Sequence, residues 1–344
     1  FPVVLEALDE LKREIGDEVA LYGLICGPFT LALHLLGNEI FLDMFDEPDK
    51  VKQVIGYCAD IGIRSSSLYL DHGADVIAVV DPMTSQISPE HFEEFVTPSV
   101  NRVFDAIRER DAYSSMFVCG DATRNLECMA RTHADCVCVD EQIPLTTMRE
   151  LSDEYDKSFG GNLRLTAVLL LGDEDDAKME AIQCIREGGR KGFILAPGCD
   201  LPYAVPPANL QAVAEMVHDE YAREVAEKSL KAKEADTFED IEVPRYHELD
   251  GVTLDVITLD STSCAPCQYM MEAVQKAAAA TQVRVFVNEH KIKVREGLGM
   301  MAKLGVKNLP TICIDGDIAF ASIIPDQHKL VESIEGHAKK KGMA

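Results

Sequence analysis

Short apolar runs alternate with longer amphipathic stretches along most of this chain. Apolar and polar residues do not alternate within these runs, as they would in a strand with one face in solvent. We therefore expect strands that are covered on both faces. The stretches between them carry apolar residues at helical spacing, as Leu5, Leu8 and Leu11 do near the start. Strands that alternate with helices predict βαβ units around a parallel sheet, and therefore an α/β fold.

The pattern predicts six strands before residue 200. They fall in residues 19–26, 74–81, 114–120, 134–141, 159–163 and 192–196. The main helices fall in residues 2–16, 49–71, 90–110, 125–132, 145–155, 175–187 and 207–223. A closed parallel barrel needs eight strands. The count therefore predicts either an open sheet or a barrel that lacks two βα units, and open edges favour a homo-oligomer.

A charged stretch, residues 223–250, precedes a smaller module. We predict a solvated helix and a linker there, because the stretch is rich in charge and contains Pro244. The smaller module has predicted strands in residues 252–260, 283–288, 308–316 and 318–322, and predicted helices in residues 268–280, 294–304 and 327–339. The predicted domains are residues 1–222 and 251–344, joined by residues 223–250.

Composition excludes several classes of function. The 344 residues carry a formal net charge of −26, which argues against a nucleic-acid partner because phosphate neutralisation needs clustered lysine and arginine. No apolar run approaches the ~20 residues of a membrane helix, so we expect no membrane partner. The eleven cysteines are scattered and odd in number, which indicates reduced thiols and a cytoplasmic protein.

Two cysteines end separate predicted strands. Cys119 closes the strand at residues 114–120, and Cys199 follows the strand at residues 192–196 in a Pro-Gly-Cys loop. The C-terminal edge of a parallel α/β barrel is where active sites form. Two thiols that meet there could bind a soft metal, most plausibly zinc. The alternative is that each cysteine is a small apolar core residue.

The smaller module contains a C-x-x-C motif, Cys264 and Cys267, between a predicted strand and a predicted helix. The helix N-terminus would lower the pKa of Cys264, which would attack a disulfide while Cys267 resolves the mixed intermediate. The module resembles the thioredoxin superfamily in this motif and in Leu309-Pro310-Thr311. That resemblance implies a cis peptide bond before Pro310. The alternative, half of a zinc site, lacks a second Cys or His pair nearby.

Residues 1 to about 222 resemble the uroporphyrinogen decarboxylase superfamily, in particular its methylcobamide:thiol methyltransferase branch. The matching stretches are Cys26-Gly27-Pro28-Phe29-Thr30, Gly73-Ala74-Asp75-Val76-Ile77 through Asp81-Pro82, Cys119-Gly120-Asp121-Ala122-Thr123, Val139-Asp140-Glu141, Gly161-Asn162 and Ile194-Leu195-Ala196-Pro197-Gly198-Cys199. The resemblance implies a TIM-like (β/α) barrel without the first two βα units. It also implies a substrate-binding or structural role for Asn162.

In that branch, zinc is held by a His-x-Cys pair and a later cysteine, and it activates a thiol. The resemblance assigns Cys119 and Cys199 to the two cysteines, whereas the histidine position is Phe117. Glu141 could supply a third ligand, and Cys138 is a further candidate. The implied reaction moves a methyl group from a methylcobamide, carried by a partner corrinoid protein, to a small thiol. The chain has no Asp-x-His-x-x-Gly corrinoid motif of its own.

Other residues are open to two interpretations. Asp81 ends a predicted strand at the active edge, so it would either act in catalysis or cap a helix. His72 and His133 precede strands and should lie at the opposite edge, as surface or structural residues.

Competing functions remain at this point. The chain could be a thiol-disulfide oxidoreductase or redox sensor on a barrel that binds no metal, or a corrinoid-binding or scaffold protein without catalysis. Uroporphyrinogen decarboxylation is disfavoured, because the family's substrate-binding arginines come from an N-terminal part with no counterpart here. In an enzyme of the methyltransferase type, the C-x-x-C module could keep Cys119 and Cys199 reduced, or Cys264 could itself be a sulfur substrate.

Overall fold

The structure, a computed structural model, describes residues 1–230, 238–262 and 264–343. Residues 231–237 of the predicted linker and Ser263 of the C-x-x-C segment therefore lie outside the described residues. The chain divides into two compact units. The first contains residues 1–162 and 184–199, and the second contains residues 163–183 and 200–344. Within the described part, no helix combines the length and apolar character needed to cross a membrane.

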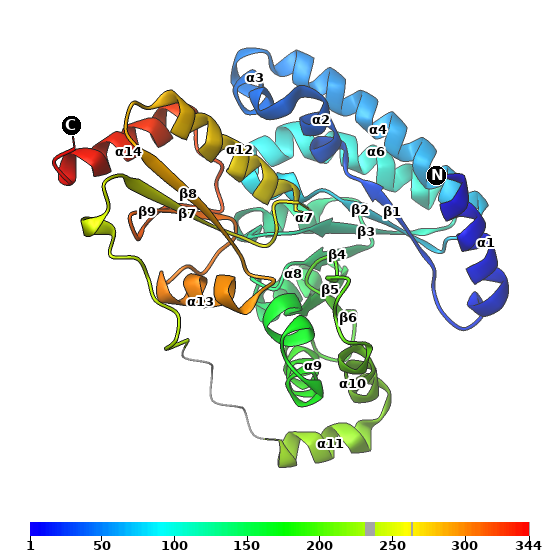
Figure 1. The fold of residues 1–344 in the computed structure, drawn as a ribbon. Helices are drawn as coiled ribbons and strands as arrows, with labels where there is room; N and C mark the ends of the chain where they lie inside the picture. Colours follow the sequence, from blue (N-terminus) through cyan, green and yellow to red (C-terminus); the bar gives the residue numbers. More distant parts are fainter. Residues whose placement is uncertain (231–237, 263, 344) are drawn as a thin grey trace. The chain divides into compact units, whose positions relative to one another are not determined.

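A parallel sheet of six strands forms the centre of the first unit, in the order β1-β2-β3-β4-β5-β6 (Figure 1). The strands are β1 Tyr22–Cys26, β2 Val76–Val80, β3 Tyr113–Val118, β4 Cys136–Val139, β5 Ser158–Leu163 and β6 Phe193–Pro197. All six predicted strands are confirmed. The described strands form an open sheet with β1 and β6 at its edges. The TIM-like barrel stays a prediction from the family resemblance.

Strand β1 departs from the expectation that every strand is covered on both faces. Its exposure alternates, and Tyr22 and Leu24 are 49% and 53% exposed. Next to it, β2 is mostly buried, with Ile77 and Val79 fully enclosed. Tyr22 and Leu24 are two residues apart and so share one face of β1, and that face is the exposed one. The apolar run therefore predicts the strand but not the exposure of its second face.

Helices and short helical turns connect the strands. The helices are α1 Pro2–Ile15, α2 Pro28–Leu36, α3 Ile40–Asp46, α4 Pro48–Asp71, α5 Pro89–His91, α6 Thr97–Arg108, α7 Leu126–Arg131, α8 Leu145–Tyr155, α9 Glu174–Gly188, α10 Pro207–His218 and α11 Glu220–Ser229. The 3-10 turns are η1 Gly37–Glu39, η2 Pro82–Gln86, η4 Thr123–Asn125 and η6 Tyr246–Glu248, and the π-helical turns are η3 Phe92–Val96 and η5 Leu165–Leu170. Helices α4 and α6 lie side by side on one face of the sheet (Figure 1).

Two predicted helices are interrupted. The helix predicted at residues 90–110 contains η3 just before Pro98, whose ring cannot donate the backbone hydrogen bond of a regular helix. The helix predicted at residues 207–223 divides at Asp219, whose side chain accepts a hydrogen bond from the backbone N–H of Ala222 (2.8 Å) and begins α11. Helix α3 was not predicted.

The C-terminal module has a mixed sheet in the order β10-β9-β7-β8. Its strands are β7 Val252–Thr258, β8 Val285–Lys291, β9 Thr311–Ile314 and β10 Asp317–Ala321, and its helices are α12 Ala265–Ala280, α13 Arg295–Lys303 and α14 Gln327–Lys340. Strand β7 is parallel to β8 and antiparallel to β9. Alternation along β7 builds two cores: Leu254 and Val256 pack with α12 and α14, whereas Ile257 packs with α13.

Candidate functional site

Cys119 and Cys199 meet at the C-terminal edge of the six-stranded sheet. Cys119 follows the last residue of β3, and Cys199 lies two residues beyond the end of β6. Their Sγ atoms are 2.7 Å apart although the residues are 80 positions apart in the chain. Both side chains are half-buried. The structure therefore brings together the two thiols that the strand ends single out.

Close backbone packing holds the two cysteine loops. A Cβ atom added to Gly198 would lie 2.6 Å from the backbone nitrogen of Glu141, so only glycine fits at this close approach of the two loops. Beside Cys119, the backbone N–H of Gly120 donates to Asp140 Oδ2 over 2.8 Å. Asp140 is buried, and burial raises the pKa of its carboxyl group despite this hydrogen bond. The loops after β3, β4 and β6 are thus locked to one another.

Asn162 supports the same edge from β5. Its side-chain amide donates to the carbonyl oxygens of Asp140 (3.0 Å) and Ile143 (2.5 Å), and the side chain is 8% exposed. These contacts fix the segment that follows β4. Of the two roles implied for Asn162, the geometry favours the structural one.

The residues present supply part of a zinc site. Two thiolates suit a soft metal, and Glu141 lies against Gly198, the neighbour of Cys199. The described residues contain no group of three or more His, Cys, Asp or Glu side chains placed to hold one metal. Phe117, at the position of the family's histidine, pairs with Val80 and Cys138 in the sheet. The two cysteines therefore fit zinc as ligands, and Glu141 is the candidate for a third.

Cys138 belongs to a separate polar cluster inside the sheet. Its Sγ atom lies 3.3 Å from Ser115 Oγ and 3.9 Å from Cys136 Sγ. Both cysteines are on β4, two residues apart, so they share one face of the strand. This placement gives Cys138 no part in a group of metal ligands.

Asp81 caps a helix. Its carboxylate accepts hydrogen bonds from the backbone N–H groups of Phe29 (3.2 Å) and Thr30 (2.7 Å), and from Thr30 Oγ1 (2.6 Å). These residues form the first turn of α2, so Asp81 caps a helix that precedes it in the chain rather than the one that follows. The side chain is 0% exposed, and burial raises the pKa of Asp81 to about 6. A catalytic role for Asp81 stays a prediction, whereas its hydrogen bonds make it a cap.

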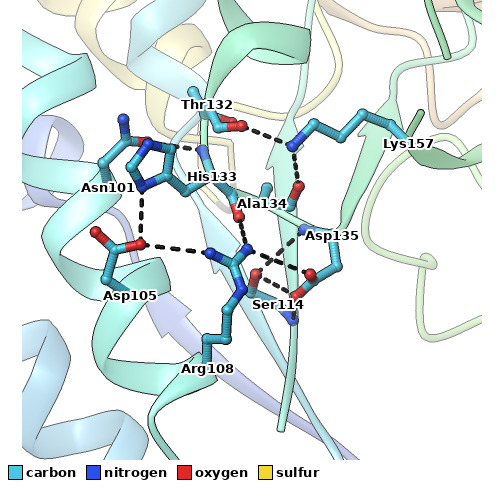
Figure 2. Close-up of polar contacts among 9 residues, drawn as sticks. All are labelled: Asn101, Asp105, Arg108, Ser114, Thr132, His133, Ala134, Asp135 and Lys157. Carbon is cyan, nitrogen blue, oxygen red and sulfur yellow. Dashed lines mark hydrogen bonds and ion pairs between the residues drawn. The ribbon is translucent and has the colours of Figure 1, made fainter. Parts of the chain in front are cut away.

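The two histidines that precede strands are held by surface contacts, and Figure 2 shows those of His133. His133 Nδ1 lies 2.8 Å from Asp105 Oδ1, and Asn101 Oδ1 accepts a hydrogen bond from the backbone N–H of His133. In the same network, Lys157 donates to the carbonyl oxygens of Thr132 and Ala134. His72 Nδ1 lies 2.8 Å from Asp9 Oδ2. These contacts agree with a structural role for both histidines.

The C-x-x-C motif lies at the start of α12. Cys264 is the N-cap residue and is half-buried, whereas Cys267 is 1% exposed. A hydrogen bond from Cys264 lowers the pKa of Cys267 against the effect of burial, and backbone N–H groups of Leu259 and Asp260 act in the same direction. The lowered pKa thus falls on Cys267, whereas the prediction named Cys264. Attack by Cys264 stays a prediction, which rests on its greater exposure and its place at the helix N-terminus. The Leu309-Pro310 bond is cis, as the thioredoxin resemblance implies.

Charged residues beside the motif were missed by the sequence analysis. Glu289 Oε1 accepts hydrogen bonds from Thr258 Oγ1 (2.7 Å) and from the backbone N–H of Ser261 (3.0 Å). Lys291 Nζ lies 2.8 Å from Asp260 Oδ1. Glu289 and Lys291 are two residues apart on β8 and so share one face of the strand. This spacing is the signal in the sequence that could have identified them. They surround the loop that leads from β7 into the motif.

Comparison with known proteins agrees with this architecture. The uroporphyrinogen decarboxylase (URO-D) family matches residues 1–220, and a thioredoxin domain matches residues 253–335. The methylcobamide:CoM methyltransferase MtbA of Methanosarcina mazei is 31% identical over 214 residues, which are 62% of each chain. A uroporphyrinogen decarboxylase of Carboxydothermus hydrogenoformans is 28% identical over 225 residues, 63% of each chain.

A solved methyltransferase structure from Methanosarcina mazei superposes with a TM-score of 0.59 at 26% identity and covers 64% of each chain. The chain thus spans less than two thirds of the length of these relatives. The match nevertheless extends through all six strands of the first sheet and both cysteine loops. The chain belongs to the uroporphyrinogen decarboxylase family and carries a thioredoxin domain on its C-terminal side.

Proposed function

We propose that this protein is a methyltransferase-like enzyme that moves a methyl group from a methylcobamide to a small thiol. A partner corrinoid protein would carry the methylcobamide. The observation that supports this function best is the meeting of Cys119 and Cys199 at the C-terminal edge of the sheet. The 31% identity to a methylcobamide:CoM methyltransferase supports the same reaction class.

Each residue of the edge has a role in this proposal. Cys119 and Cys199 hold zinc as thiolates, and Glu141 is the candidate third ligand. Bound zinc would keep the incoming thiol in its thiolate form at neutral pH, so that sulfur is the nucleophile. Asp140 and Asn162 keep the cysteine loops in register through the backbone contacts described above. Phe117 stands where the family has a histidine ligand and cannot bind metal. The third ligand position of the zinc site therefore depends on Glu141.

Metal content of the reduced full chain tests the zinc site. We expect near one zinc per chain in the wild type, and loss of that zinc in Cys119→Ser and Cys199→Ser. Cys138→Ser is the matched control, because it removes a thiol of the same sheet that lies outside the cysteine loops. Glu141→Gln should weaken retention against a chelator. Absence of zinc from the wild type, prepared with zinc and reductant, would refute the site.

A second candidate function is thiol-disulfide oxidoreduction by the C-terminal module. The observation that favours it is the placement of Cys264 at the N-cap of α12 with the buried Cys267 behind it. We expect the full chain to reduce insulin disulfides in the presence of a dithiol, and Cys264→Ser to abolish that activity. Equal rates for wild type and variant would eliminate this function. Zinc content should be the same in both proteins.

A further inference from the structure

The distance between the Sγ atoms of Cys119 and Cys199 lies between the values expected for a disulfide and for two ligands of one zinc ion. A disulfide bond is about 2.05 Å long. Two thiolates on one tetrahedral zinc are about 3.8 Å apart, as follows from a Zn–S bond of about 2.3 Å. The observed 2.7 Å is less than an ångström from the first state and about one ångström from the second. By contrast, the Sγ atoms of Cys136 and Cys138, in the same sheet, are 3.9 Å apart.

The surroundings favour a covalent link as much as a metal. The two loops come from β3 and β6, and their contacts with Asp140 and Glu141 hold them close without help from a ligand. The described residues place no third metal ligand beside the pair. Both thiols are half-buried rather than enclosed, so a small oxidant or a second thiol can reach them.

We propose that Cys119 and Cys199 form a reversible disulfide, and that the dithiol of Cys264 and Cys267 reduces it. The disulfide half of this inference stands on the thiol geometry alone. The consequence that only the reduced pair binds zinc rests on the proposed function. The C-terminal module then has a substrate within the same polypeptide sequence, namely a disulfide at the edge of the family's catalytic sheet.

The chemistry balances with a hydroperoxide as oxidant. One thiolate attacks the peroxide oxygen to give a sulfenic acid and an alcohol, or water when the oxidant is hydrogen peroxide. The other thiol then condenses with the sulfenic acid and releases water. For reduction, the Cys264 thiolate attacks one sulfur of the Cys119–Cys199 disulfide and expels the other as thiolate. The Cys267 thiolate next attacks Cys264 Sγ, which breaks the mixed disulfide and expels the second sheet cysteine as thiolate. Cys264 and Cys267 become the new disulfide, and their two electrons and two protons pass to Cys119 and Cys199.

Disulfide mapping of the full chain tests both halves. The reduced, metal-free protein receives one equivalent of hydrogen peroxide, is equilibrated, and is then alkylated and digested for mass spectrometry. In the double variant Cys264→Ser/Cys267→Ser, we expect the Cys119–Cys199 cross-link. In the wild type, we expect the bond at Cys264–Cys267 instead. Single Cys267→Ser should trap a mixed disulfide that joins Cys264 to one of the two sheet cysteines.

The controls separate this proposal from protein damage and from the zinc proposal. Cys136→Ser should give the wild-type map, and circular dichroism should show that each variant is folded. Added zinc should slow oxidation of Cys119 and Cys199 at least tenfold if the reduced pair is the metal-binding form. No cross-link in the double variant would overturn the disulfide site. A cross-link that persists equally in the wild type would overturn its reduction by the C-terminal dithiol. The zinc content of the reduced protein tests the proposed function separately, whatever the result of the disulfide mapping.

Discussion

Replacing Asp81 with asparagine should change how the stability of the first unit depends on pH. Asp81 is completely buried at the start of α2, and its pKa is raised to about 6 by that burial. This folded pKa exceeds the usual value of 3.8. Between about pH 4 and pH 6, Asp81 is therefore protonated in the native state but ionised in the unfolded chain. The stabilisation from this proton is fully present below pH 4 and is lost as the pH rises through about 6.

The magnitude follows from the size of the shift. A difference of about two pKa units corresponds to about 3 kcal/mol over the whole window. When the pH falls from 7.5 to 5, which is one unit below the folded pKa, the free energy of unfolding of the wild type should rise by about 1.4 kcal/mol. The Asp81→Asn side chain is neutral at every pH, so the variant should show none of this gain. The variant also leaves the N–H of Phe29 or Thr30 facing an amide N–H, which costs about 1–3 kcal/mol at all pH values.

Hydrogen exchange with mass spectrometry measures this difference locally. The free energy of opening is obtained from peptides that cover β2 and α2, after correction for the intrinsic exchange rate at each pH. The wild-type minus Asp81→Asn difference cancels the titration of all other groups. Peptides from β7 serve as an internal control and should not respond to the substitution. Parallel pH profiles for the two proteins would refute the argument that Asp81 carries a raised pKa.

Two further substitutions test packing and a buried hydrogen bond. Gly27→Ala should destabilise the first unit by about 1–3 kcal/mol, since the added Cβ would overlap the Asp81 side chain, and thermal unfolding should show a lower Tm. Gly56→Ala, within α4, is its matched control. The nearest side-chain atom to the new Cβ, Arg102 Nη1, would be 3.9 Å away, so a gain in stability of about 0.5–1 kcal/mol is expected. Tyr246→Phe removes a 2.6 Å hydrogen bond to the fully buried carboxylate of Asp255 and should lower the opening free energy of β7 by about 1.5–3 kcal/mol. Unchanged protection of β7 in hydrogen exchange would contradict that role for Tyr246.

The order of the elements and the meeting of the two cysteines could be predicted from the sequence. Apolar runs of strand length, punctuated by helices with apolar spacing, specify a parallel sheet whose strand ends share one edge. Cys119 and Cys199 follow two such ends, so their convergence needed no knowledge of the distances. The cis bond at Pro310 could likewise be expected, but only through the resemblance to thioredoxins.

Other features depended on contacts between distant residues. The sequence alone left Asp81 between a catalytic role and a cap. The pairing of β1 with β2 places α2 against its carboxylate and so shows the cap, while the catalytic role stays a prediction. The pairing of Glu289 with Thr258 similarly depends on the register of β7 and β8. Local patterns encode which face of an element is apolar, whereas the register between strands sets which polar atoms meet. The 2.7 Å between the two sulfurs belongs to that second category, because it results from the packing of three loops that no short segment specifies.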